Sequence, residues 1–143
     1  RDLGIEDRVT FTGYVTDEEL RGMLTRATVF AMPSIAELQS IATMEAMASG
    51  LPIVAANAMA LPHLVHEGEN GYLFEPGNSS DLAAKLSHVL TLPPAELQKM
   101  KESSLRYIAA HDIQRTLTIF ERLYRGQTVT DPVTDASLDE SVS

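Results

Sequence analysis

Two carboxylates lie close together in the segment 33–50. Glu37 lies in a predicted loop, and Glu45 follows eight residues later in a helix-forming run. Nearly every neighbour of Glu45 is apolar, so we expect this helix to be buried on almost all sides (Ile41, Ala42, Met44, Ala46, Met47, Ala48). A buried carboxylate without partners costs several kcal/mol. Glu45 is therefore expected to meet hydrogen-bond donors, either from the protein or from a ligand.

The start of the same helix predicts a binding place for an anion. Residues 38–41 would offer backbone N–H groups without partners inside the helix, together with the positive end of the helix dipole. Phosphate is the natural occupant of such a terminus, and Glu37 beside it could accept hydrogen bonds from hydroxyls. These two features together describe a sugar phosphate or a nucleotide sugar. The alternative is that Glu45 is a solvated position on a partly exposed helix and Glu37 an ordinary loop charge.

Short runs of β-branched and aromatic residues alternate with helical patterns along the chain. This alternation predicts an α/β fold, a Rossmann-like parallel sheet flanked by helices. We expect four strands, over residues 9–12, 29–32, 53–56 and 71–74. Parallel sheets bind ligands beyond the carboxyl ends of their strands, which places the Glu37 loop at the ligand-binding edge.

Capping residues indicate where the helices begin. Thr16 and Glu19 have the spacing of a capping box that opens a helix to about residue 26. The helix with Glu45 is expected over about 40–49, before a glycine that would end it. The remaining helical patterns are a short turn over 61–65 and three helices that begin near Ser79, Pro94 and Ile113.

Length and composition limit the classes of protein that this chain can be. With 143 residues it has room for one domain, and 20 acidic against 11 basic residues give a net charge of −9, which argues against nucleic acid as a partner. The absence of cysteine excludes disulfides and thiolate metal sites. We predict a domain over 1–125 and a disordered acidic tail over 126–143. Because the chain begins at Arg1, we expect a piece of a longer protein whose first βα units lie upstream.

The motifs around the two glutamates follow one another in a distinctive order. They read Pro33-Ser34, Glu37 and Glu45 with seven residues between them, Ala46-Met47-Ala48, Gly50, Pro52 and Ile53-Val54, flanked by Arg8–Val15, Glu67–Leu73 and Pro76-Gly77. This series resembles the retaining, nucleotide-sugar-dependent glycosyltransferases of the GT-B fold, known as group 1 or family 4. The resemblance extends over about residues 3–124.

The resemblance implies the C-terminal, donor-binding half of a two-domain hexosyltransferase, acting on a lipid or another bacterial glycoconjugate. It implies a nucleoside diphosphate sugar as donor and co-substrate, no cofactor, and no obligatory metal. Glu37 would be the catalytic residue that contacts the transferred sugar, and Glu45 would hold the ribose. The diphosphate would face the backbone amides of Gln39, Ser40 and Ile41, and the base would lie near the loop of Gly13, Tyr14 and Val15.

Two departures from the family pattern concern glycines. Ser40 occupies a position where the family often has glycine, and a side chain there restricts positive φ. The family's Gly-Gly-x-Pro-Glu is replaced by Met59-Ala60-Leu61-Pro62-His63, which leaves any role of His63 in doubt. His63 and His66 could share one face of a helical turn, but no third metal ligand stands nearby in the sequence.

The family's basic pair that neutralises the leaving diphosphate would belong to the upstream part of the protein. We therefore expect this fragment alone to be inactive, and we expect the missing N-terminal half to bind the acceptor. The protein would be cytoplasmic, without a membrane span, and peripheral contact with the inner face of the membrane through the missing half stays open. Two alternatives remain: a non-catalytic nucleotide-sugar-binding or scaffold domain of the same fold, and a flavodoxin-like signalling domain.

Overall fold

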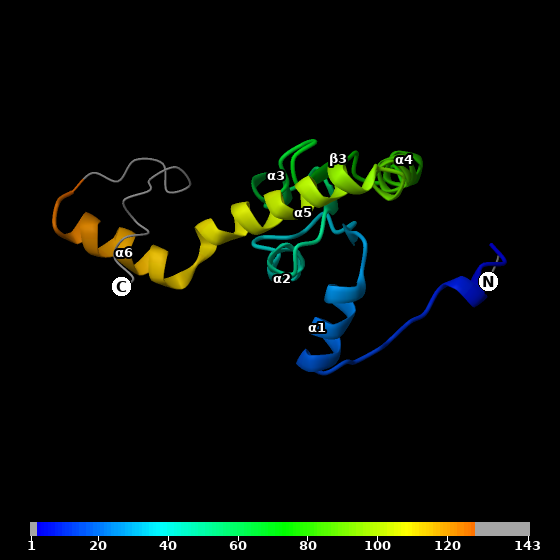
Figure 1. The fold of residues 1–143 in the computed structure, drawn as a ribbon, viewed down its shortest axis with the longest axis horizontal. Coiled ribbons are helices and arrows are strands. Elements are labelled where there is room, and N and C mark those ends of the chain that lie inside the picture. Colours follow the sequence, from blue (N-terminus) through cyan, green and yellow to red (C-terminus); the bar gives the residue numbers. More distant parts are fainter. Residues whose placement is uncertain (1–2, 128–143) are drawn as a thin grey trace.

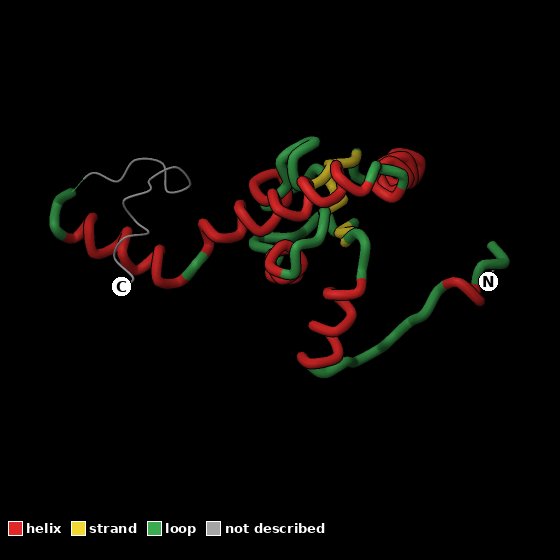
Figure 2. Tube along the Cα trace, viewed as in Figure 1, coloured by secondary structure: helices red, strands yellow, loops and turns green. Residues whose placement is uncertain are grey.

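The computed structural model describes residues 3–127 of the chain, and Figures 1 and 2 show its course. Three parallel strands form the sheet in the order β1-β2-β3, with β1 at Phe30–Met32, β2 at Ile53–Ala56 and β3 at Gly71–Phe74. Every residue of the central strand β2 is buried. The predicted α/β fold with a parallel sheet is confirmed.

Helices follow each strand, as the alternating sequence pattern predicts. Helix α2 packs on β1 and β2, α4 packs on β3 and β2, and α5 packs against α2. The helices are α1 (Asp17–Arg26), α2 (Ile41–Ala48), α3 (Leu61–Leu64), α4 (Ser79–Leu90), α5 (Pro94–Ile108) and α6 (Ile113–Tyr124), with 3₁₀ turns η1 (Glu6–Arg8) and η2 (Ala109–His111). None of the described helices is long and apolar enough to cross a membrane.

The start of α1 is fixed by the predicted capping box. The backbone N–H of Glu19 donates to Thr16 Oγ1 over 3.3 Å, and the N–H of Thr16 donates to the Glu19 carboxylate over 2.8 Å. The latter hydrogen bond lowers the pKa of Glu19, because it stabilises the charged form. Reciprocal bonds of this kind satisfy two N–H groups that the helix itself leaves unpaired.

One buried hydrogen bond joins the long helix α5 to the segment that enters the central strand. Ser104 Oγ donates to the carbonyl oxygen of Leu51 over 2.6 Å, and both residues are buried. The surrounding core is apolar and includes Met47, Ile53 and Val89. Since a buried carbonyl without a donor is costly, this bond fixes the position of α5 against α2 and β2.

The prediction of a strand over residues 9–12 is wrong for the described chain. These residues run in extended conformation without a strand partner, and the Phe11 side chain is 94% exposed. Figure 1 shows the N-terminal segment leading away from the rest of the molecule. A strand exists only when another strand satisfies its backbone groups, and β2 is the only strand paired with β1 among residues 3–127.

The C-terminal part of the described chain is helix α6, which contacts η2 and extends away from the sheet (Figure 1). Gly126 and Gln127 follow it, and residues 128–143 lie outside the described residues. The predicted disordered tail over 126–143 and the domain over 1–125 therefore stay predictions.

A glycine in β3 allows β3 and the buried strand β2 to approach each other. A Cβ atom at Gly71 would overlap the carbonyl oxygen of Ile53, whose backbone is fixed in the core. We expect Gly71→Ala to lower the free energy of unfolding, measured by urea denaturation, by about 3 kcal/mol. Gly22→Ala is the matched control, because Gly22 lies inside α1 and a Cβ there meets only the end of the flexible Arg26 side chain. The control should raise stability by about 0.5–1 kcal/mol; equal effects of the two changes would contradict this account.

Candidate functional site

Helix α2 begins with an unusual backbone turn. Ser40 caps the helix with φ 53° and ψ 63°, the left-handed conformation that favours glycine. Its side chain is only 4% exposed, and its hydroxyl lies 2.7 Å from Thr43 Oγ1 within the first turn. The structure therefore places a buried serine where the family pattern often has glycine. The left-handed backbone at this position explains why the family often has glycine there.

This turn leaves a row of backbone amides without protein acceptors. Within the described part of the chain, no carbonyl or side chain accepts a hydrogen bond from the N–H groups of Gln39, Ser40 or Ile41. The first bond of the helix is donated by Met44 to the carbonyl of Ser40, over 3.1 Å. Three consecutive free donors at a helix start have the properties of an anion site.

The two glutamates lie on either side of these amides along the chain. Glu37 is half-buried in the loop before α2, and Glu45 lies in the second turn of the helix. Neither carboxylate has a hydrogen-bond or ion-pair partner among residues 3–127. Both are therefore free to contact a ligand.

The expectation that α2 is buried on nearly every side is wrong for this chain. Only one face is buried, formed by Thr43, Ala46 and Met47, whereas Glu45 is exposed and Ile41 is 62% exposed. The physical reason is that α2 packs on β1, β2 and α5 through the face that these three residues form. The burial of α2 therefore gives no reason to expect a partner for Glu45. The reason is that Glu45 follows the last of the three free amides by four residues in the same helix.

A second loop at the carboxyl edge of the sheet joins the first. The N–H of Ala60, in the segment after β2, donates to the carbonyl of Glu37 over 3.1 Å. The adjacent residue Met59 has φ 52°, the second left-handed non-glycine residue of the described chain after Ser40. Ser40 and Met59 are both positions where the family pattern has glycine. His63, in α3, is exposed.

A cavity between α1 and α2 adds residues that the sequence analysis did not single out. It has a volume of about 370 Å³, with Asp17, Arg21 and Glu45 at its charged positions and a lining completed by other residues (Leu20, Leu24, Ala48, Ser49). The sequence did contain a signal for this face of α1. Asp17 and Arg21 are spaced i, i+4, as are Leu20 and Leu24, which predicts that these side chains lie on one side of the helix.

The predicted base-binding loop is not brought into contact with the Glu37 loop by the described structure. Gly13, Tyr14 and Val15 lead into the end of α1 that lies farther from the sheet, and Tyr14 is 94% exposed. The loop is connected to the cavity only through Asp17, which follows it two residues later. A role in base binding thus stays a prediction.

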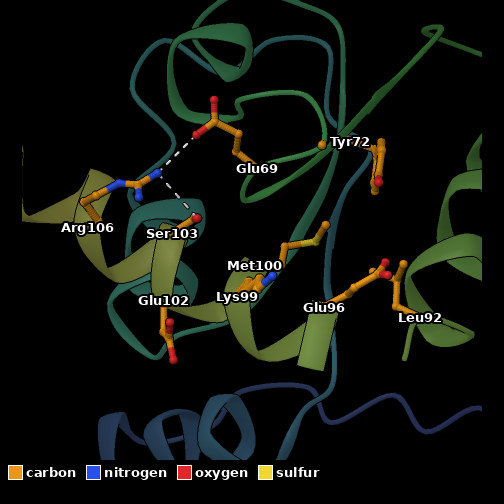
Figure 3. A pocket seen from close by; sticks show the side chains of 10 residues that line it. Glu69, Tyr72, Leu92, Glu96, Lys99, Met100, Glu102, Ser103 and Arg106 are labelled. Carbon is orange, nitrogen blue, oxygen red and sulfur yellow. Dashed lines mark hydrogen bonds and ion pairs between the residues drawn. The ribbon is translucent and has the colours of Figure 1, made fainter. Parts of the chain in front are cut away.

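Another cavity, of about 590 Å³, is lined by α5 and the turn before β3 (Figure 3). Its best-defined contact is the ion pair between Arg106 and Glu69, 3.1 Å apart. Tyr107 also donates its hydroxyl to Glu69 over 2.6 Å, which raises the pKa of Tyr107 because the neutral form is the donor. These groups satisfy one another and join α5 to the turn before β3, so they are explained by the fold.

The histidines do not assemble a metal site in the described chain. The His66 ring stacks on Tyr107 with 3.7 Å between centroids, so it belongs to the contact with α5. Within residues 3–127, no group of three or more histidine, aspartate or glutamate side chains is placed to hold a metal ion.

Comparison with known proteins decides the family. The family model described as "Glycosyl transferases group 1" matches residues 1–91. This chain belongs to the group 1 glycosyl transferases. The MMP alpha-(1->4)-mannosyltransferase of Mycolicibacterium hassiacum is 41% identical over 106 residues, which cover 73% of this chain and 26% of that protein. The D-inositol 3-phosphate glycosyltransferase of Mycolicibacterium smegmatis is 34% identical over 122 residues, covering 85% and 28%.

Solved structures show the same architecture for this glycosyl transferase. Anabaena HepE, solved in complex with UDP, superposes with a TM-score of 0.73 at 28% identity, covering 87% of this chain and 33% of HepE. The C-terminal domain of LpcC, a group 1 glycosyl transferase from Francisella tularensis, gives a TM-score of 0.66 at 27% identity, covering 78% and 57%. The chain has the fold of part of the C-terminal Rossmann-like half of a GT-B protein, and it spans about a quarter of the length of the two curated relatives.

The left-handed backbone at Met59 makes a stability test possible. Met59 is 56% exposed, so its side chain contributes little burial, whereas its Cβ strains the backbone at φ 52°. We expect Met59→Gly to raise the free energy of unfolding by about 0.5–1 kcal/mol, as measured by urea denaturation. The control Met59→Ala keeps the Cβ and should stay within about 0.5 kcal/mol of the unchanged protein. A loss of stability in the glycine variant would show that the side chain, rather than the backbone, matters here.

Proposed function

We propose that this glycosyl transferase chain binds a nucleoside diphosphate sugar and that the full-length protein transfers the hexosyl group with retention of anomeric configuration. The observation that carries the proposal is the row of amides at Gln39, Ser40 and Ile41, which lie along the chain between two glutamates and, like them, have no partner among residues 3–127. A diphosphate, hydroxyls and a sugar are the chemical groups that such an arrangement can bind together.

The diphosphate is assigned to the start of α2. Backbone amides and the positive end of the helix dipole stabilise negative charge without the cost of desolvating a side chain. The charge on the leaving diphosphate increases as the glycosidic bond breaks, so fixed donors at this point stabilise the transition state more than the ground state. The left-handed turn at Ser40 leaves these donors without an acceptor among residues 3–127.

Glu45 is assigned to the ribose. It follows Ile41 by four residues, which is about 6 Å along the helix axis and more than one turn. A carboxylate at that distance from the phosphate-binding amides accepts hydrogen bonds from the two ribose hydroxyls. Charge-assisted hydrogen bonds of this kind are roughly twice as strong as neutral ones.

Glu37 is assigned to the transferred sugar and would orient it for reaction. Along the chain it precedes the amides whereas Glu45 follows them, and its backbone is held by the bond from Ala60. The similar protein HepE was solved with UDP bound, and the relative from Mycolicibacterium hassiacum carries the name of a mannosyltransferase. Both support a nucleoside diphosphate hexose as donor.

The rest of the reaction is proposed for the parts of the protein outside this chain. No lysine or arginine is present in the loop and helix of residues 33–49, so the remaining charge on the diphosphate requires cations from elsewhere. We therefore propose that the N-terminal half supplies basic residues and the acceptor site, a lipid or another glycoconjugate being the acceptor, and that the fragment alone is inactive. The proposal includes catalysis without an obligatory metal, in the cytoplasm or at the inner face of the membrane.

Substitution of the two glutamates should separate binding from turnover in the full-length protein. We expect Glu45→Gln to weaken the binding of UDP or GDP, whichever the unchanged protein prefers, by about 10–100-fold in calorimetry, because charge-assisted bonds to the ribose are lost. We expect Glu37→Gln to leave nucleotide affinity within about threefold, since the sugar is absent from these ligands, and to reduce sugar transfer by about 100-fold or more.

Glu96→Gln is the control, because Glu96 is an exposed glutamate of α5 that lines the other cavity. Unchanged nucleotide binding in Glu45→Gln would contradict the ribose assignment. Nucleotide binding by the unchanged full-length protein without any sugar transfer would favour the alternative of a non-catalytic nucleotide-sugar-binding domain.

A further inference from the structure

The lining of the cavity between α1 and α2 includes one cationic side chain, together with Glu45. Arg21 lies in the middle of α1 and lines the same space of about 370 Å³ as Glu45 and Asp17. A cavity of this volume is in the range of small-ligand sites. It borders the helix whose first amides are assigned to the diphosphate, so it adjoins the proposed donor site.

The guanidinium of Arg21 is not used by the fold. Among residues 3–127, no side chain or carbonyl accepts a hydrogen bond from it, and no carboxylate lies within ion-pair distance. The helix that carries it is anchored by other residues, since Leu24 is buried and Leu20 packs against the core. Arg21 is thus positioned by α1 but has no structural partner among the residues that the structure describes.

The charges of the cavity indicate which part of a nucleotide it would accept. Two carboxylates, Asp17 and Glu45, and one guanidinium line the cavity, so the space is net negative and repels a diphosphate. Leu20, Leu24 and Ala48 supply apolar surface. The cavity therefore offers apolar surface, carboxylates that can accept hydrogen bonds from hydroxyls, and one planar guanidinium. These groups suit the uncharged nucleoside part of a nucleotide sugar.

We propose that Arg21 binds the base of the donor nucleotide and is a specificity-determining residue of this enzyme; this inference rests on the proposed function. With Glu45 on the ribose, the base lies toward α1, within the cavity that Arg21 lines. A guanidinium presents a rigid, planar set of donors that can stack on a base or donate to the oxygen and nitrogen atoms at its edge. Because uracil and guanine differ in these acceptors, an arginine there distinguishes between them.

The test uses the full-length protein and compares Arg21→Ala with Arg26→Ala. Arg26 is the matched control, an exposed arginine of the same helix that does not line the cavity. Dissociation constants for UDP and GDP are measured by competition up to millimolar concentration. We expect Arg21→Ala to weaken the preferred nucleotide about tenfold and the other one less, so that the ratio of the two constants moves toward one, while Arg26→Ala changes neither.

Two results would overturn the inference while leaving the proposed function intact. Unchanged affinities in Arg21→Ala would show that Arg21 does not touch the nucleotide. An equal loss for both nucleotides would show that it neutralises the diphosphate rather than distinguishing the base. By contrast, failure of the unchanged protein to bind either nucleotide would overturn the proposed function itself, and this inference with it.

Discussion

The backbone turn at Ser40 is the constraint on which the proposed site depends. Its left-handed conformation ends the loop after β1 and starts α2. Three backbone N–H groups at this point have no hydrogen-bond acceptor among residues 3–127. The turn is held by the contact between Ser40 and Thr43 and by the bond from Ala60 to Glu37. Strain of this kind persists only where the surrounding structure determines it, and in the proposed site it leaves three donors for the diphosphate.

The sheet and the helix starts could be predicted from the sequence because their signals are local. The capping box at Thr16 and the apolar run of β2 depend on neighbouring residues and on burial, and both form as predicted. The strand over 9–12 and the burial around Glu45 failed for one shared reason. Each depends on partners distant in sequence, which the described residues do not supply.

The site could be predicted only in part. The motif predicts Glu37, Glu45 and the amides between them as site residues, because their spacing along one chain segment is visible in the sequence. Arg21 was not singled out, since only the arrangement of α1 and α2 in space brings it to the cavity that Glu45 lines, and it has no motif of its own. The family is established by the match over residues 1–91.

The most direct test of the account is amide chemical-shift mapping of the full-length protein, selectively labelled with ¹⁵N, during titration with UDP and GDP. The account predicts that the amide signals of Gln39, Ser40 and Ile41 shift with the preferred nucleotide, because its diphosphate accepts their hydrogen bonds. Saturable nucleotide binding that leaves these three amides unchanged, and shifts the residues around the Glu69–Arg106 cavity instead, would contradict it.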